Sequence, residues 1–216
     1  MQIDRAEVRR YLGCGREDPG PQVAAEIESA LAALERQATP RHIWAAYPVE
    51  VGENCVRIAS LTLESRGLAH HLRGCAQACL FAATLGPEPD RLMQRAALTA
   101  VASAVVLQAA AAAMIEAYCD ECCDALAAHF QKQGLYLRPR FSPGYGDLSL
   151  DCQPAFLRVL DAEKRIGLTC TASHLMAPSK SVTAIIGLST AQERPSQGCR
   201  SKCAGCPNTG CAYRLE

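Results

Sequence analysis

The first third of the chain contains both apolar residues at helical spacing and short runs that include β-branched residues. Residues 4–12 predict a short helix capped by Asp4, whose carboxylate can accept an unpaired backbone N–H at the positive end of the helix dipole. Residues 22–37 predict a second helix, because their apolar side chains fall on one face. Further along, the pattern predicts strands at 41–51, 56–63 and 77–85, and a short helix at 65–72.

The longest regular segment predicted is helical and runs from 91 to 133, as one bent helix or two, with Gly134 as its natural end. Its residues 96–115 carry no charge, and a helix of that length could cross a bilayer. The strongly apolar side chains form a single helical stripe: Leu98, Val101, Val105 and Ile115. This pattern favours a buried helix of a soluble protein over a membrane span.

Beyond this helix, residues 138–147 contain two prolines and two glycines and predict a shaped loop. A helix at 154–165 and strands at 168–171 and 181–188 follow. Helices and strands mix without regular alternation, so the predicted class is α+β. The predicted organisation is one domain over 1–190, a linker at 191–198 and a cysteine-rich tail at 199–216.

The charge balance narrows the range of partners. Twenty-two Lys and Arg residues match twenty-two Asp and Glu residues, so no net field attracts nucleic acid or anionic lipid. Aromatic residues make up only 5 %, which together with the Ala-rich segments favours helical packing. Thirteen cysteines, an odd number, follow a charged N-terminal segment that does not resemble a signal peptide. We therefore expect reduced thiols and a cytoplasmic location.

Four cysteines crowd the tail with three, two and four residues between successive members: Cys199, Cys203, Cys206 and Cys211. Thiolates are soft ligands that select zinc or iron–sulfur clusters. Zinc sites usually separate two cysteine pairs by a longer segment, so the compact spacing favours a [4Fe-4S] cluster, with zinc as the alternative. A reactive tail that binds nothing is the remaining reading. Cys119 and Cys122 continue the helical stripe and predict small buried hydrophobic positions.

The loop and the segments that follow it resemble a known family. The motif Arg-x-x-x-Gly-Tyr occurs as Arg140, Gly144 and Tyr145, and the helix 156–167 and the block 175–182 come after it. Together they resemble the activation domain of vitamin B12-dependent methionine synthase, and in particular its compact stand-alone relatives. The resemblance implies a single α+β fold with a mixed or antiparallel sheet and a long Ala-rich helix.

By this resemblance the chain would bind S-adenosylmethionine in a shallow groove and present its methyl group to a cobalamin or other corrinoid on a partner. Arg140 would contact the carboxylate of the ligand, and Gly144 and Tyr145 would shape the groove. Glu116 would hold the amino group of the ligand, and Asp4 would act similarly near the N-terminus. The alternatives without a ligand are a solvated loop pair for Arg140 and Tyr145, a surface helix position for Glu116 and a helix cap for Asp4.

The chain departs from the family at Thr171-Ala172-Ser173, where the family commonly carries a glutamate in place of Ala172. It also contains no cobalamin, folate or homocysteine module, so a corrinoid protein or B12-dependent methionine synthase modules would be its partner. The resulting hypothesis is a component of a methyltransferase that supports reductive methylation of the corrinoid, with the tail cluster as a source of the electron. Two alternatives remain: a corrinoid-protein adaptor that does not bind S-adenosylmethionine, and an iron–sulfur scaffold.

Overall fold

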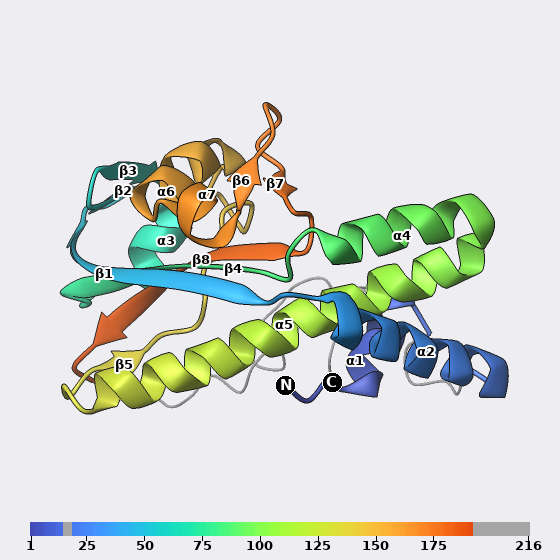
Figure 1. Ribbon diagram of the computed structural model, residues 1–216. Coiled ribbons are helices and arrows are strands. Elements are labelled where there is room, and N and C mark those ends of the chain that lie inside the picture. The colour runs from blue at the N-terminus through green and yellow to red at the C-terminus, as the bar shows by residue number, and fades with distance from the viewer. Residues whose placement is uncertain (15–18, 192–216) are drawn as a thin grey trace.

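The computed structural model describes residues 1–14 and 19–191. Its centre is a six-stranded sheet with helices on both faces, in the strand order β3-β2-β1-β4-β8-β5 (Figure 1). Every neighbouring pair in this sheet is antiparallel. Its strands are β1 (Arg41–Val51), β2 (Cys55–Ile58), β3 (Leu61–Glu64), β4 (Gln77–Thr84), β5 (Tyr136–Leu137) and β8 (Ser181–Ser189). A separate two-stranded ribbon pairs β6 (Thr169–Cys170) with β7 (Met176–Ala177).

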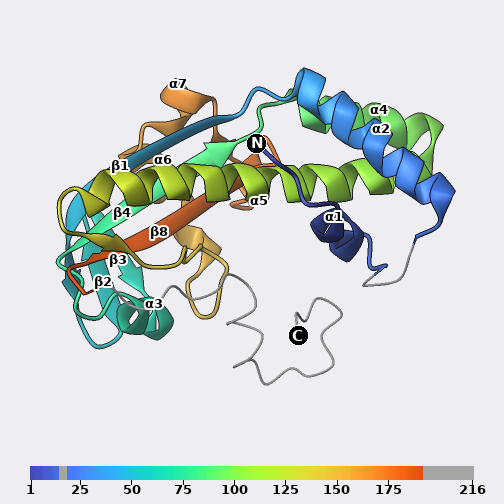
Figure 2. The same ribbon diagram turned by 90° about the horizontal axis from the view of Figure 1, so that it is seen from below.

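One face of the sheet packs against a layer of long helices. The longest of them, α5, runs under the sheet and continues past its end, where α2 and α4 lie beside it (Figures 1 and 2). On β4, Cys79, Phe81 and Ala83 point into this core. The layer consists of α1 (Arg5–Tyr11), α2 (Pro21–Gln37), α4 (Glu88–Thr99) and α5 (Val101–Gln131).

The opposite face carries a second core beneath short helices and the β2–β3 hairpin. On the same strand β4, the intervening residues Ala78, Leu80 and Ala82 point into it. Because successive side chains of a strand alternate between faces, an unbroken apolar strand can serve two cores at once. The covering elements are α3 (Arg66–His71), the 3-10 turn η1 (Leu150–Cys152), α6 (Gln153–Val159) and α7 (Ala162–Ile166).

The predicted α+β class and the antiparallel sheet are confirmed. The two N-terminal helices lie where the pattern predicts them, and the backbone N–H of Ala6 donates to Asp4 at 2.8 Å, which makes Asp4 the cap of α1. The long segment forms two helices, because Ala100 takes an extended conformation with φ −155° and ψ 87° between them. Burial of Cys119 and Cys122 is also confirmed.

Three predicted elements differ from the structure. The strand predicted at 56–63 is the β2–β3 hairpin, which turns where Ala59 adopts φ 51°. The helix predicted at 154–165 breaks into α6 and α7 at Asp161, which adopts φ 52°. The strand predicted at 168–171 pairs with β7 outside the main sheet. In the first two cases an ordinary residue takes the left-handed conformation, which local propensity does not predict.

The prediction of a buried apolar stripe is wrong for its first three positions. Leu98 is 87 % exposed, Val101 71 % and Val105 54 %, whereas Ile115 is buried. The α4–α5 hairpin extends beyond the sheet (Figure 1), so no described element covers these side chains. The stripe therefore marks the core only in the part of α5 that lies under the sheet.

Among the described helices, α5 alone is long and apolar enough, by length and composition, to cross a membrane. It contacts β4, β5 and β8 as well as α1, α2 and α4. Its buried residues recur from Val106 to Phe130. This packing is that of a core helix, which satisfies the same criteria of length and composition.

Candidate functional site

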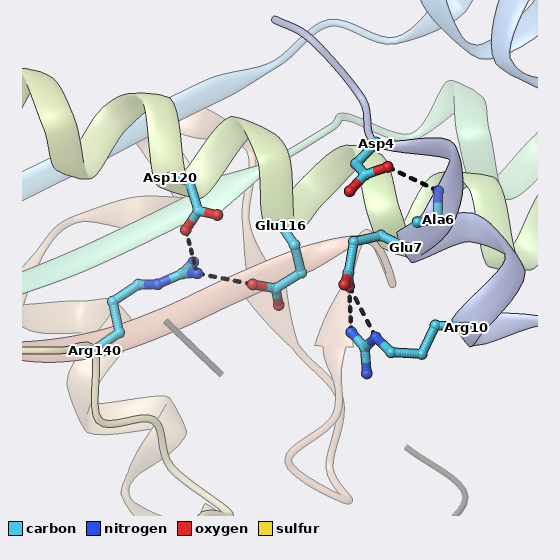
Figure 3. A network of polar contacts seen from close by, with 7 residues as sticks. All are labelled: Asp4, Ala6, Glu7, Arg10, Glu116, Asp120 and Arg140. Carbon is cyan, nitrogen blue, oxygen red and sulfur yellow. Dashed lines mark hydrogen bonds and ion pairs between the residues drawn. The ribbon is translucent and has the colours of Figure 1, made fainter. Parts of the chain in front are cut away.

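Arg140 lies between two carboxylates of α5. Its Nη2 donates to Oε2 of Glu116 at 2.9 Å and to Oδ1 of Asp120 at 2.8 Å (Figure 3). Glu116 and Asp120 are one helical turn apart, so both side chains point from the same face of α5 toward the loop. The structure thus brings together Arg140 and Glu116, two residues that the family resemblance assigned to one ligand site.

The guanidinium of Arg140 is set into the protein, since its side chain is only 21 % exposed. Burial on its own would lower the pKa of Arg140, but Glu116 and Asp120 outweigh this effect and the pKa is raised. Nη1 of Arg140 is buried and has no hydrogen-bond partner within the described part of the chain. Arg140 is therefore a permanent cation that retains unused donor capacity.

The residue that follows Arg140 in the loop is hydrogen-bonded to the sheet. Phe141 and Ile185 of β8 exchange two backbone hydrogen bonds, from N of Phe141 at 3.0 Å and from N of Ile185 at 2.8 Å. This bridge fixes the backbone next to Arg140. The guanidinium is consequently held from both sides, by the sheet at its backbone and by α5 at its head group.

Gly144 and Tyr145 follow in the same loop and form its exposed turn. Gly144 adopts φ 84°, and a Cβ there would lie 3.1 Å from Cδ2 of Leu150, so both conformation and space favour glycine. Tyr145 is 54 % exposed and packs edge-on against Phe141 with ring centroids 5.3 Å apart. An aromatic ring presented in this way offers an apolar contact to a ligand or partner.

Asp4 lies on α1, which packs against α5. Figure 3 shows its carboxylate directed to the backbone of Ala6, and no ion pair joins it to Arg140. The structure therefore places Asp4 as a helix cap. Figure 3 also shows Glu7 on α1, whose Oε2 accepts a hydrogen bond from Nη2 of Arg10 at 2.5 Å.

Asp120 is the site residue that the sequence reasoning missed. Its signal was available, because it follows Glu116 by four residues and therefore shares its helix face. Ala172, where the family commonly has a glutamate, lies exposed between β6 and β7. A carboxylate reaches the same ribbon from another element, since Oδ1 of Asp151 lies 3.0 Å from Nδ1 of His174.

Three cysteines of the described chain, Cys79, Cys119 and Cys123, do not have the properties of activated nucleophiles. Burial raises the pKa of Cys79 to about 12 and that of Cys123 to about 11, and it also raises the pKa of Cys119. These thiols stay protonated near neutral pH and behave as small apolar side chains.

The four tail cysteines, Cys199, Cys203, Cys206 and Cys211, lie outside the described residues. Within residues 1–14 and 19–191, no group of three or more His, Cys, Asp or Glu side chains could hold a metal ion. The metal ligands predicted from the tail spacing remain a prediction. The chemistry of their donor set, four thiolates, fits a [4Fe-4S] cluster or zinc.

The described arrangement is suited to a zwitterionic ligand. A guanidinium with spare donors binds a carboxylate, and a partly exposed carboxylate such as Glu116 can accept bonds from an ammonium group. The two groups are already adjacent, so one ligand that carries both charges could engage both. No general base, nucleophile or bound metal is needed for such recognition.

No protein-family model matches the chain, and no curated protein matches it in sequence. Among solved structures, it is similar to the crystal structure of the MetH reactivation domain bound to AdoHcy, with a TM-score of 0.61 and 15 % identity. The match covers 83 % of this chain and 74 % of that one. At this identity the likeness shows the fold, and it confirms the resemblance predicted from the loop and the segments after it.

Proposed function

We propose that this protein binds S-adenosylmethionine and supports the reductive methylation of a corrinoid carried by a partner protein, such as a B12-dependent methionine synthase. The observation that carries the proposal is the Arg140–Glu116 pair, in a fold whose relative was crystallised with AdoHcy. The amino-acid portion of S-adenosylmethionine carries one carboxylate and one ammonium group. Arg140 and Glu116 are complementary to these two charges.

The unused donor of Arg140 supports this assignment. Nη1 is buried without a partner, and a buried donor left unpaired costs free energy that a ligand carboxylate would recover. Gly144 and Tyr145 lie four and five residues further along the chain, where they can border the ligand. Asp4 could contact the ligand only by giving up the hydrogen bond from N of Ala6, because its carboxylate caps α1.

In the proposed reaction the partner's corrinoid is the substrate. One electron reduces cob(II)alamin to cob(I)alamin, whose electron pair then forms the cobalt–carbon bond as the carbon–sulfur bond of S-adenosylmethionine breaks. The products are methylcob(III)alamin and S-adenosylhomocysteine. This chain contributes binding and orientation, holding the methyl donor in line with the metal, and none of its side chains acts as a nucleophile.

Calorimetric titration of the full chain with S-adenosylmethionine tests the binding step. We expect saturable binding that Arg140→Ala weakens by about tenfold to a hundredfold, because a charge-assisted bond is lost. Arg158→Ala, on the exposed surface of α6, is the matched control and should bind as the wild type does. Absence of binding to the wild-type protein would favour the alternative of a corrinoid-protein adaptor that does not bind S-adenosylmethionine. That alternative is consistent with Ala172, where the family commonly has a glutamate.

The transfer step is tested with a partner whose corrinoid is held as cob(II)alamin and supplied with a one-electron donor. We expect methylcob(III)alamin to form only when this protein and S-adenosylmethionine are both present. Product formation that is unchanged by Arg140→Ala would contradict the assigned role of Arg140.

The tail is proposed to hold a [4Fe-4S] cluster on Cys199, Cys203, Cys206 and Cys211, with zinc as the alternative. The support is the compact spacing of four soft ligands. Iron, sulfide and zinc analysis after anaerobic purification separates the two. About four irons and four sulfides per chain are expected for the cluster, and Cys206→Ser should abolish them. One zinc without iron would make the tail a structural site.

A further inference from the structure

A cleft of about 730 Å³ lies at the other end of the loop 138–147. Its walls are the β1–β2 turn at 51–53, α3 with the turn that follows it, and Gly146 and Asp147. Figures 1 and 2 both show α3 close to β2 and β3, at the end of the sheet away from α2 and α4. The volume is in the range of small-molecule sites. None of Arg140, Glu116 and Tyr145 lines this cleft.

Three cationic or potentially cationic side chains line one wall. Arg66, His70 and Arg73 follow each other at intervals of four and three residues, so they share one face of α3 and its continuation. The side chains of His70 and Arg73 have no hydrogen bond or ion pair with any residue that the structure describes. Like charges at this spacing repel each other, so the arrangement costs stability unless an anion offsets it.

Arg66 is held in place without being neutralised. Its Nε donates to Oδ1 of the Asn54 amide at 3.1 Å, which leaves both terminal nitrogens of the guanidinium unused by this contact. An amide orients the guanidinium but carries no charge. The positive charge of Arg66 therefore remains available to the cleft.

Asp147 lines the same cleft, but its carboxylate is already engaged by the start of α3. It accepts hydrogen bonds from Oγ of Ser65 at 2.5 Å, from N of Arg66 at 2.7 Å and from N of Gly67 at 3.1 Å. The bond from Ser65, followed by the two backbone bonds, lowers the pKa of Asp147. Its carboxylate is occupied by these bonds, and no ion pair joins it to Arg66, His70 or Arg73.

The remaining walls leave room for a ligand. A Cβ at Gly74 would meet nothing within 4 Å, so this part of the backbone is open. Val51 and Ala69 supply apolar surface. Glu53 is an exposed carboxylate on the turn that faces α3, and it has no ion pair among the described residues.

We propose that this cleft binds a small molecule that carries a phosphate group, with the phosphate between Arg66, His70 and Arg73. Two guanidiniums and an imidazole offer more donors than the two oxygens of a carboxylate can accept, whereas a phosphate presents three oxygens in a tetrahedral arrangement. The cleft is larger than a bare phosphate, so the organic part of the ligand would lie against Val51 and Ala69. This site is independent of the proposed S-adenosylmethionine site.

Calorimetric titration of the full chain with inorganic pyrophosphate, and separately with adenosine 5′-monophosphate and adenosine, tests the proposal. We expect pyrophosphate or the monophosphate to bind saturably and adenosine to bind far more weakly. The double variant Arg66→Ala/Arg73→Ala should lose at least about tenfold in affinity. Glu53→Gln should bind more tightly, since it removes a repulsive charge from the cleft. Failure of both phosphate probes to saturate the wild-type protein would overturn the proposal.

The matched control is Arg57→Ala, which removes an exposed arginine of β2 that is paired with Glu50 and lies outside the cleft. It should leave pyrophosphate binding unchanged, as should Arg140→Ala. Equal weakening by Arg57→Ala and by the double variant would show a nonspecific charge effect and overturn the site. A double variant that melts earlier but binds pyrophosphate like the wild type would show that the cations only stabilise α3. Because Arg140→Ala is expected to weaken S-adenosylmethionine binding and to leave pyrophosphate binding unchanged, the two proposals fail separately.

Discussion

The two ends of the loop 138–147 carry opposite arrangements of charge. At its start, the cation Arg140 is paired with Glu116 and Asp120 from α5. At its end, the anion Asp147 is engaged by Ser65 and the backbone of α3, and the arginines beside it have no carboxylate partner among the described residues. At the first end the cation is paired with carboxylates, and at the second end the arginines are not.

This difference bears on how each end would bind a ligand. At Arg140 the protein supplies both signs of charge, which suits a zwitterion and disfavours a simple anion, because Glu116 and Asp120 would repel it. At α3 the cations are in excess over the free carboxylate of Glu53, which suits a multiply charged anion. If both proposals hold, the loop 138–147 would border two sites of different selectivity.

The largest effect should come from Gly144→Val. The substitution puts a β-branched residue at φ 84° and brings its Cβ to 3.1 Å from Leu150, so we expect a loss of about 3 kcal/mol in the free energy of unfolding. Binding of S-adenosylmethionine should weaken with it. Gly134→Val is the matched control, because Gly134 also has a positive φ of 72° but an added Cβ meets nothing within 4 Å. Urea denaturation of both variants should show a smaller loss for Gly134→Val, and equal losses would exclude a specific role of the Leu150 contact.

A smaller effect is expected from Ser65→Ala at the other end of the loop. Ser65 is buried, accepts a bond from N of Leu68 at 2.9 Å and donates to Asp147, so one side chain joins the start of α3 to the loop. Its loss should cost about 1 to 2 kcal/mol of unfolding free energy. Ser149→Ala removes the exposed cap of η1 and should cost less. Thermal melts compare the two, and a cost at Ser149 equal to that at Ser65 would argue against a special role for this junction.

The sequence predicted the loop and its neighbours more fully than it predicted the charges around them. Helix periodicity predicted α1 and α2, and apolar runs predicted the central strands, because these signals are local. The assignment of Arg140 and Glu116 to one site rested on the family resemblance, since no periodicity links a loop residue to a helix residue 24 positions away. Their direct ion pair was not predicted. Asp120 could have been predicted from its spacing to Glu116.

The cleft at α3 could not be predicted in this way. Arg66, His70 and Arg73 by themselves form a pattern typical of a solvated helix face. Their environment depends on the turn at 51–53 and on Asp147, which is 80 residues from Gly67 in sequence. The exposed end of the α4–α5 hairpin also depends on tertiary structure. Its apolar stripe predicted burial, but no described element covers Leu98.

The smallest effect, and the sharpest distinction between the two ends, is the response of Asp147 to acid. The bonds from Ser65 and the backbone hold its pKa below the ordinary value of 3.8 in the folded state. A carboxyl with a depressed folded pKa contributes stability that is fully present above its unfolded pKa and is lost as the pH falls through its folded pKa. From about pH 5 downward, the unfolding free energy of the wild type should therefore fall more steeply than that of Asp147→Asn. Ser65→Ala should give an intermediate slope, because it removes the largest cause of the pKa shift while the carboxylate remains.

Denaturation at a series of pH values measures the unfolding free energy, and NMR of the Asp147 carboxyl carbon measures its pKa. If the unfolding free energies of the wild type and Asp147→Asn changed in parallel with pH, the Asp147 carboxylate would not be held by α3 in solution. That carboxylate would then be available to neutralise part of the positive charge of the cleft.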